Sequence, residues 1–293
     1  MVQRVLSSLP GGHRINYWMQ LASKSHSQAI IDARIPNLLE FHEKIQAVRP
    51  FSEMRILEIS AGWNAINALI FSLLGAKEVI ATDYVRHVRL REMIKVLKAA
   101  RKEASRIAAI RNSPADTVYQ EIDRLLETHA EDQLFSAARI KYLAPADATR
   151  LGLPDGELDM VYSFGVLAHF PEEQLEPLAK ETRRVLKPHG LVAHSMGLQD
   201  PYTRYRGGEM TNFLRYSDRT WKFISSGMLY NNRWRASQHT QLYTKLGAKI
   251  ILADRKFRPE DLPRVKEMQL AKRFEGLSPE DLSTHAYQLI CQF

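Results

Sequence analysis

Cysteine is almost absent from this sequence: Cys291 is the only one among 293 residues. A single cysteine cannot form an internal disulfide framework, and it excludes a cysteine-rich zinc site. Long apolar runs are also missing, since none approaches the roughly 20 residues that a membrane-spanning helix needs. Residues 1–20 contain Arg4 but no apolar segment of the secretory type. We therefore expect a reduced, cytoplasmic setting without a membrane span.

The sequence also lacks internal repeats, low-complexity arms and Lys/Arg tails. Its hydrophobic content of 45% and charged content of 25% are ordinary for a globular protein. A chain of this length can bury a large core. We expect one domain over residues 1–293, with helical additions.

Positive charge is in excess, with a formal net charge of +8. Such an excess favours either an acidic partner or a solvated basic face. Nine of the basic residues fall between Arg86 and Arg111, in what reads as one long helix. Because these charges fall on many faces of that helix, a solvated face is the favoured interpretation, and a nucleic-acid partner is less favoured than a small molecule.

Apolar runs and helical patterns alternate along the chain. Strands are predicted at 55–59, 79–82, 139–143, 158–163, 191–195, 249–253 and 285–292, and core helices at 64–74, 172–186 and from 237 to about 246. Apolar and polar residues alternate at helical spacing over residues 13–48, interrupted at Pro36. This pattern predicts two helices, which would form an N-terminal helical cap within residues 1–50. Residues 86–138 predict a helical insertion broken near 112–114, and residues 199–235 a lid. This alternation indicates an α/β fold with a mainly parallel sheet covered on both faces.

The first strand is followed by the most informative turn of the chain. Glu58 stands near the end of that strand, Ser60-Ala61-Gly62 supply small residues, and Asp83 ends the second strand. Small residues let the backbone approach a ligand, and an acid at the next strand tip can accept hydrogen bonds from both ribose hydroxyls. The pattern predicts a nucleoside site.

Later segments carry a family resemblance. The residues concerned are Ile56-Leu57-Glu58-Ile59-Ser60-Ala61-Gly62, Thr82-Asp83, Asp147-Ala148-Thr149-Arg150-Leu151, Leu158-Asp159-Met160-Val161-Tyr162-Ser163, Val166-Leu167-Ala168-His169-Phe170 and Arg184-Val185-Leu186-Lys187-Pro188-His189-Gly190. In this order, over about residues 54–195, they resemble the motifs of class I S-adenosylmethionine-dependent methyltransferases. The resemblance implies a Rossmann-like, doubly wound, seven-stranded sheet with an antiparallel last strand, and S-adenosylmethionine as cofactor.

The resemblance also implies roles for individual residues. Glu58 would order the turn and hold the ammonium of the methionine moiety, Asp83 would hold the ribose, and Asp147 would accept from the adenine amino group while the Ala148 amide donates to a ring nitrogen. The remaining expected cofactor contacts are Ser60, Ala61, Gly62, Trp63, Tyr84, Ser163 and, from the N-terminal segment, Tyr17. Trp63 has core packing as its alternative role, and a plain amphipathic helix would explain Tyr17.

Two departures from the family pattern stand out. Ser60 and Asn64 replace the first and third glycines. Serine fits if its φ is negative, and Asn64 would cap the following helix. The separation between Asp83 and Asp147 exceeds the compact pattern, so the extra helices would cap the sheet or form the face of a homodimer. The missing glycines leave open a non-catalytic relative.

Acid–base and acceptor residues follow the fourth and fifth strands. His169 and His194 are candidate general bases, with helix capping and core packing as their respective alternatives. The segment of residues 199–235 is rich in arginine and aromatic residues, which suit a planar, anionic or sugar-like acceptor. Its candidate contacts are Tyr202, Arg204, Arg206 and Arg233, against the alternative of a surface loop packed by aromatics.

Competing enzyme classes lack support. A nicotinamide oxidoreductase would have more glycines in the first turn, and a cytosine C5 methyltransferase needs a nucleophilic cysteine, whereas Cys291 lies in the last strand. Residues 163–166 do not form the Asn/Asp-Pro-Pro-aromatic motif of DNA adenine methyltransferases. No compact metal-ligand cluster stands out. The sequence favours methyl transfer to a hydroxyl of a sugar, polyketide or similar small molecule; the alternatives are an RNA or protein methyltransferase, or a non-catalytic cofactor-binding relative.

Overall fold

The computed structural model describes residues 27–203, 209–225 and 230–293. Tyr17, Arg204 and Arg206, which were predicted as site residues, lie outside these ranges. The strands form one seven-stranded sheet in the order β3-β2-β1-β4-β5-β7-β6. Their bounds are β1 Arg55–Ile59, β2 Glu78–Thr82, β3 Ile140–Leu143, β4 Leu158–Phe164, β5 Leu186–Gly197, β6 Lys249–Lys256 and β7 Ala286–Gln292. The expected mainly parallel, Rossmann-like sheet with an antiparallel final pair is confirmed.

The described residues divide into two compact units. The β1 unit comprises residues 27–163, 180–193 and 293, and the β6 unit comprises residues 164–179, 194–203, 209–225 and 230–292. The single domain expected over residues 1–293 stays a prediction. Within the described ranges, no helix combines the length and the apolar character that crossing a membrane requires.

The strands of the β1 unit are buried apolar runs. In β1 and β2 every residue after the first is buried, as expected for parallel strands covered on both faces. Both pair in parallel, with Ile59 opposite Thr82, and Ile59 also lies opposite Ser163 of β4. The carboxyl ends of three neighbouring strands are therefore level, which is where open α/β sheets bind ligands.

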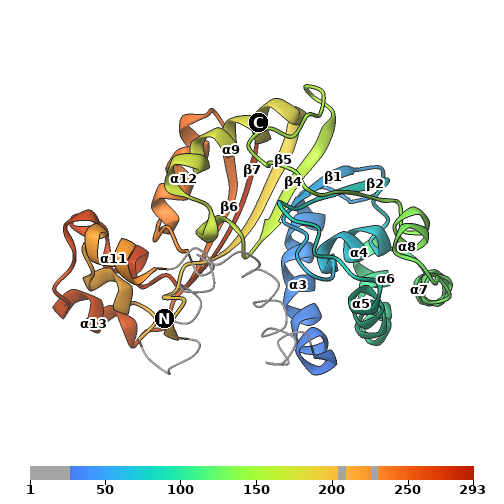
Figure 1. The fold of residues 1–293 in the computed structure, drawn as a ribbon, viewed down its shortest axis with the longest axis horizontal. Helices are drawn as coiled ribbons and strands as arrows, with labels where there is room; N and C mark the ends of the chain where they lie inside the picture. Colours follow the sequence, from blue (N-terminus) through green and yellow to red (C-terminus); the bar gives the residue numbers. More distant parts are fainter. Residues whose placement is uncertain (1–26, 204–208, 226–229) are drawn as a thin grey trace. The chain divides into compact units, whose positions relative to one another are not determined.

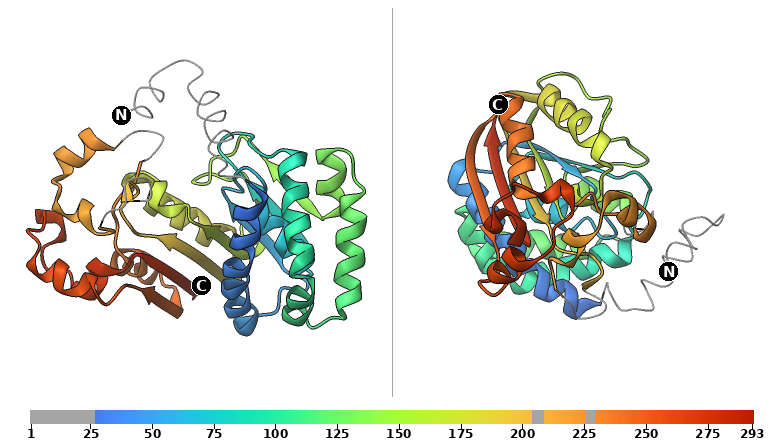
Figure 2. Two further views of the ribbon diagram at one scale, coloured as in Figure 1. Left: turned by 90° about the horizontal axis from the view of Figure 1, so that it is seen from below. Right: turned by 90° about the vertical axis from the view of Figure 1, so that its left-hand side faces the viewer.

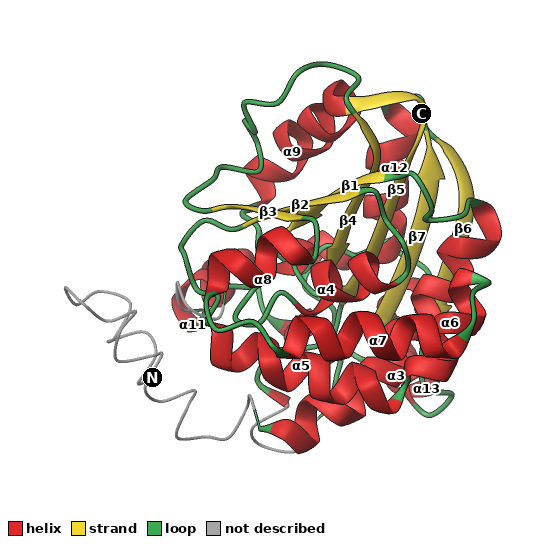
Figure 3. Cartoon of the chain, turned by 90° about the vertical axis from the view of Figure 1, so that its right-hand side faces the viewer, coloured by secondary structure: helices red, strands yellow, loops and turns green. Residues whose placement is uncertain are grey.

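Helices of the β1 unit cover these strands. They are α3 Gln28–Val48, α4 Ile66–Leu73, α5 Leu90–Lys102, α6 Ala104–Arg111, α7 Ala115–Leu126 and α8 Glu131–Ala137, and α9 Glu172–Val185 follows β4. Every residue of α4 is buried, and α4 packs against β2 (Figure 1). Helices α3, α5, α6 and α7 lie side by side (Figure 3), and α6 ends at Arg111 with Asn112 as its C-cap, at the stretch 112–114 where a break was predicted.

Pro36 does not interrupt the chain as predicted, because α3 runs through it without a break. Proline removes one backbone donor and therefore weakens a helix interior. Here one face of α3 is fully buried, including Ile35, Leu38 and Leu39. Burial of that face outweighs the missing hydrogen bond, since packing supplies most helix stability in proteins.

The β6 unit is built on an antiparallel pair. Strands β6 and β7 pair over Lys249–Lys256 with an irregularity between Ile250 and Leu252, and α12 Ala236–Lys245 packs on them. The other helices are η1 Leu167–His169, η2 Asn212–Arg215, α11 Asp218–Ile224, α13 Asp261–Glu267, η3 Lys272–Phe274 and α14 Pro279–Ser283. Trp221, Phe213 and Phe274 belong to one buried cluster of this helical part, which is orange to red in Figure 2.

Several predicted boundaries were wrong by a few residues. The helix expected at 64–74 begins at Ile66, because Ala65 takes a left-handed conformation. Asn64 therefore does not cap it. Strand β5 begins at Leu186 instead of residue 191, and β6 extends to Lys256. Helices α13 and α14 were not predicted, because they are short and carry little periodic signal.

Replacing Pro36 by alanine is expected to raise the free energy of unfolding by ~2 kcal/mol, because residue 36 gains an N–H for the Asp32 carbonyl. Denaturant unfolding measures the change. The control is Asn37→Ala, an exposed neighbour in the same turn, where helix propensity changes by about 0.5 kcal/mol and one exposed side-chain bond to the Ala33 carbonyl is lost. A Pro36 variant no more stable than this control would contradict the account of α3.

Candidate cofactor and acceptor sites

The turn between β1 and α4 is built from left-handed residues. Ser60 has φ 62°, Gly62 has φ 68° and Ala65 has φ 47°. The condition under which serine would fit this position, a negative φ, is therefore not met. Left-handed conformations are unfavourable for residues with a Cβ, so the turn holds two such residues under strain. A Cβ at Gly62 would meet no atom within 4 Å, which leaves the backbone open to approach.

A hydrogen bond ties this turn to the end of β2. The Gly62 amide donates to Asp83 Oδ2 at 2.9 Å, and the Ala61 amide donates to the Thr82 carbonyl at 2.9 Å. Asp83 is itself held, since its amide donates to the Leu143 carbonyl and its carbonyl accepts from Ala146. The carboxylate is thus fixed at the carboxyl ends of β1 and β2, where the sequence placed a ribose-binding acid.

Burial raises the pKa of the Asp83 carboxyl, while the Gly62 amide and the nearby His87 oppose that rise. The exposed fraction of Asp83 is 9%. Tyr84, the next residue, is 78% exposed, so its ring stands at the surface beside this carboxylate. Trp63 stacks on His87, with ring centroids 4.5 Å apart and an interplanar angle of 29°.

Glu58 lies inside the core beneath the turn. Its Oε1 accepts from Asn67 Nδ2 at 2.8 Å, and the side-chain oxygen Oδ1 of Asn67 accepts from the Tyr162 hydroxyl at 3.2 Å. Glu58 Oε2 is a buried oxygen without a hydrogen-bond partner among the described residues. Burial raises the pKa of Glu58 to about 8. Asn67 was not predicted; the sign available was a lone asparagine in an otherwise apolar helix.

The predicted adenine-binding segment follows β3. Asp147 is exposed, and its Oδ1 accepts from the Thr149 amide at 2.8 Å and the Thr149 hydroxyl at 2.7 Å. These bonds lower the pKa of Asp147. No hydrogen bond to Asp147 Oδ2 is found within the described part of the chain. Ala148 is half-buried, and Ser163 at the level of the β1 end is buried.

His169 lies in the short η1 turn of the β6 unit. It is exposed, and its Nδ1 lies 2.8 Å from the Tyr230 carbonyl oxygen. A carbonyl can only accept, so this bond assigns the proton to Nδ1 and leaves Nε2 as the acceptor of the neutral ring. Asn232, which was not predicted, anchors the turn. Its side chain donates to the Leu167 and Phe170 carbonyls, and its main-chain N–H donates to the Ala168 carbonyl.

His194 has a different environment. It is fully buried on β5, with Nε2 2.6 Å from the Tyr243 hydroxyl. Burial lowers the pKa of His194 to about 3. An imidazole with such a pKa takes up a proton poorly at neutral pH, which is the environment of a core histidine and favours the packing role.

Two of the predicted acceptor contacts can be located in the β6 unit. Arg233 is 2% exposed; its guanidinium donates to the Phe213 and Tyr216 carbonyls and pairs with Asp218 at 2.6 Å. The Tyr202 hydroxyl donates to the Ile224 carbonyl at 3.0 Å. Arg235, not predicted, is also buried and donates to four main-chain carbonyls, from Leu198, Asp281, Leu282 and Thr284.

Most charges of the helical insertion are paired. The ion pairs are Arg86–Glu131, Arg91–Glu92, Lys95–Glu92, Arg101–Asp123, Lys102–Asp32, Arg106–Glu43 and Arg111–Glu121. Five basic residues, Arg4, Arg14, Lys24, Arg204 and Arg206, lie outside the described ranges and account for five of the eight excess charges. The insertion is therefore a solvated, charge-balanced face.

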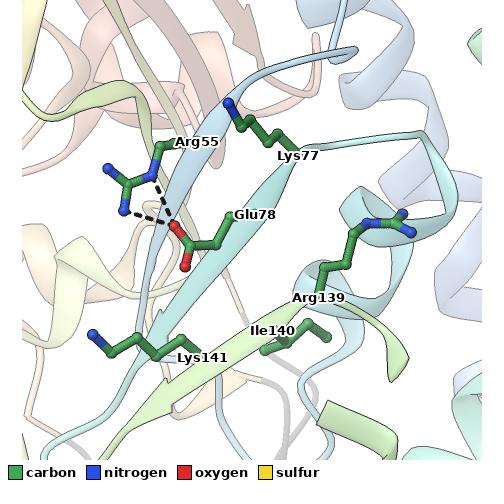
Figure 4. A pocket seen from close by; sticks show the side chains of 6 residues that line it. All are labelled: Arg55, Lys77, Glu78, Arg139, Ile140 and Lys141. Carbon is green, nitrogen blue, oxygen red and sulfur yellow. Dashed lines mark hydrogen bonds and ion pairs between the residues drawn. The ribbon is translucent and has the colours of Figure 1, made fainter. Parts of the chain in front are cut away.

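A surface depression of about 390 Å³ lies at the opposite, amino ends of β1, β2 and β3 (Figure 4). It is lined by Arg55, Lys77, Glu78, Arg139, Ile140 and Lys141. Arg55 pairs with Glu78 at 2.7 Å and with Glu157 at 2.5 Å. None of the predicted site residues lines this depression. Among the described residues, no group of three or more metal-ligating side chains is present.

Comparison with known proteins agrees with the resemblance seen in the sequence. Residues 104–194 match the sequence profile of a family described as "Methyltransferase domain". This match supports a class I S-adenosylmethionine-dependent methyltransferase. S-adenosylmethionine is accordingly its cofactor. The matched residues of this methyltransferase domain include Asp147, Ala148 and Ser163, whereas the β1 turn and Asp83 precede them.

Solved structures of methyltransferases are among those to which the chain is similar. A S-adenosylmethionine-dependent methyltransferase from Mesorhizobium loti is 15% identical, with 85% of this chain and 96% of that chain covered and a TM-score of 0.47. An N-methyltransferase from Haemonchus contortus, in complex with phosphomonomethylethanolamine and S-adenosylhomocysteine, is 17% identical, with 85% and 51% covered and a TM-score of 0.43. No curated protein matches the sequence.

The residues at the ends of β1 and β2 fit the cofactor. The open space at Gly62 allows main-chain approach, and the carboxylate of Asp83 is held at the adjoining strand end. A nucleoside with two ribose hydroxyls supplies donors for such a carboxylate.

Replacing Asp83 by alanine is expected to weaken S-adenosylmethionine binding by ~1–3 kcal/mol, because charged hydrogen bonds to the ribose are lost. Calorimetric titration measures the affinity. Asp132→Ala serves as the matched control, since this aspartate of α8 has a side chain 93% exposed and should leave the affinity unchanged. Equal affinities for wild type and Asp83→Ala would contradict the ribose role.

Glu58 gives the protein a pH-dependent stability. Its pKa is raised from the ordinary 4.5 to about 8. Between these values the folded state holds a proton that the unfolded state has lost, so the free energy of unfolding falls as pH rises and levels off above about 8. The Glu58 contribution to the slope is at most ~1.4 kcal/mol per pH unit.

Glu58→Gln keeps an acceptor for Asn67 and cannot ionise. Its free energy of unfolding should exceed that of wild type at pH 8 and match it more closely at pH 5, as measured by denaturant unfolding. The exposed Glu127→Gln is the control and should follow the wild type. An identical pH dependence in wild type and Glu58→Gln would show that Glu58 ionises normally.

Proposed function

We propose that this protein transfers a methyl group from S-adenosylmethionine to a hydroxyl of a small molecule such as a sugar, polyketide or other secondary metabolite, with His169 as the general base. The observation that supports this most is the hydrogen bond from His169 Nδ1 to the Tyr230 carbonyl oxygen, at 2.8 Å. It orients an exposed imidazole with Nε2 as a proton acceptor.

The proposed chemistry asks little of the protein. When bound, S-adenosylmethionine supplies a methyl group that its sulfonium has already activated, so alignment of the acceptor accounts for much of the acceleration. A hydroxyl is a weak nucleophile while it keeps its proton. His169 Nε2 would take that proton as the hydroxyl oxygen attacks, which general-base catalysis values at roughly 10²–10⁴ in rate.

Anchoring of the turn favours His169 over His194. Asn232 fixes the main chain on both sides of His169 through Leu167, Ala168 and Phe170. A base gains from such pre-organisation, because it reaches the transition state without reorganising. His194 is buried against Tyr243 and is assigned to the core.

Cofactor residues in this proposal come from the β1 unit. Asp83 holds the ribose, and the main chain of Ser60, Ala61 and Gly62 approaches the methionine moiety, with Tyr84 beside the ribose. Asp147, through Oδ2, and the Ala148 amide hold the adenine. Glu58 orders the turn through Asn67, because its carboxyl is directed into the core.

Arg233 and Tyr202 receive a supporting role. Their polar groups are engaged by main-chain carbonyls of the lid, so they order this segment in place of touching the acceptor directly. The paired charges of the insertion favour a small acceptor over RNA and leave it as a sheet cap or homodimer face. The single buried cysteine supports a cytoplasmic location.

Replacing His169 by glutamine should lower the rate of methyl transfer by about 10²–10⁴ and remove the rise in rate that accompanies imidazole deprotonation. The measurement is S-adenosylhomocysteine formation against pH, with a panel of phenols, sugars and polyketide alcohols as acceptors. Cofactor affinity should not change.

The control is His129→Gln, an exposed histidine ahead of α8, which should behave as wild type. An unchanged pH–rate profile in His169→Gln would remove this residue as the base. Cofactor binding without turnover on any acceptor would favour the non-catalytic relative instead.

A further inference from the structure

Trp63 and His87 connect the two loops of the cofactor site. Trp63 belongs to the turn after β1, and His87 to the segment after β2. Their rings stack at 4.5 Å with an interplanar angle of 29°, and both residues are half-buried. The same two loops are joined by the hydrogen bond between Gly62 and Asp83. The stack is therefore a second link between the two loops, beside the Asp83 carboxylate that is proposed to bind the ribose.

His87 rests on a fixed support. Its amide donates to the Tyr142 hydroxyl at 3.2 Å, and the Tyr142 ring stacks on Phe135 with centroids 5.3 Å apart. The Arg86 guanidinium also lies over the Tyr142 ring, 5.2 Å from the ring centre. Tyr142 of β3, which stacks on Phe135 of α8, thus holds the His87 main chain. Trp63 packs on the imidazole ring of this held residue.

His87 also acts on the Asp83 carboxylate. Its imidazole lowers the pKa of Asp83, which places the ring close enough to influence that charge. Asp83 and Tyr142 are titratable groups that interact with His87, and Arg86 and Asp83 act in turn on Tyr142. Trp63 thereby covers a group that faces the carboxylate.

The turn needs such a link because its backbone is strained. Ser60 and Ala65 stand on either side of Trp63 in left-handed conformations, at φ 62° and 47°. Glycine would adopt these conformations without strain, whereas residues with a Cβ hold them only when the surroundings enforce them. The aromatic stack is the side-chain contact that ties the middle of this strained stretch to a rigid neighbour.

We infer that the Trp63–His87 stack is a cofactor-positioning pair: it clamps the strained β1 turn against the β2 loop and forms the wall beside the nucleoside of S-adenosylmethionine. The pair helps to hold Ser60 and Ala65 in left-handed conformations that glycine would adopt without strain. The inference rests on the cofactor site of the proposed function, and it is independent of the acceptor and of His169.

Calorimetric titration of the full chain with S-adenosylhomocysteine tests the pair. Trp63→Ala and His87→Ala should each weaken binding by about three- to tenfold, the range that aromatic pairs contribute. The double variant should lose no more than the larger single loss, because the two residues act as one unit. His87→Phe keeps an aromatic partner and should stay within twofold of wild type.

Ser60→Gly separates clamping from simple contact. In this background one of the two strained residues is relieved, so Trp63→Ala should weaken binding clearly less than it does with Ser60 present. Ser60→Ala, which retains the Cβ and removes only the hydroxyl, is the matched control and should leave the full Trp63 effect. The exposed His129→Ala controls for loss of an imidazole elsewhere.

The outcomes are distinct. Wild-type protein that does not bind S-adenosylhomocysteine overturns the cofactor site itself. Binding by wild type with unchanged affinity in Trp63→Ala overturns the pair while the site stands. Fully additive losses in the double variant, or an equal Trp63 effect with Ser60 and with glycine, overturn the clamp. Thermal unfolding confirms that each variant is folded.

Discussion

The hydrogen bond from the Gly62 amide to the Asp83 carboxylate joins the two loops that carry the proposed cofactor contacts. It is made because β1 and β2 pair in parallel with Ile59 opposite Thr82, which brings both strand ends to one level. The buried apolar runs of these strands set that register. The Ala61 amide, donating to the Thr82 carbonyl, repeats the link one residue earlier. Core packing, strand register and the geometry of the proposed cofactor site thus depend on each other.

Burial separates side chains that look alike in the sequence. His169 is exposed with its tautomer assigned by a carbonyl, whereas His194 is enclosed and its pKa falls to about 3. Arg233 and Arg235 look like surface cations ready for an anionic acceptor. Both are buried and donate to main-chain carbonyls, because guanidinium groups have five donors and can satisfy several chain ends at once. The β6 unit uses these arginines to hold its irregular segments.

The sequence predicted the strands well and the special conformations poorly. The limits of β1 were correct because an apolar run between polar residues is a local signal. Asp83 at the end of β2 was correct for the same reason. The sequence did not predict the left-handed conformation of Ser60 or the burial of Arg233. The predicted interruption at Pro36 was wrong. Each of these depends on partners distant in the sequence, chiefly carbonyls and packed faces, which no local pattern displays.

The most direct test is a crystal structure of the full chain with S-adenosylhomocysteine. The account predicts the ribose hydroxyls within hydrogen-bond distance of the Asp83 carboxylate, the amino acid tail against the main chain of Ser60 and Gly62, and the Gly62–Asp83 bond retained. A ligand bound elsewhere, for example in the depression at the amino ends of β1, β2 and β3, or a turn that releases Asp83 on binding, would contradict it.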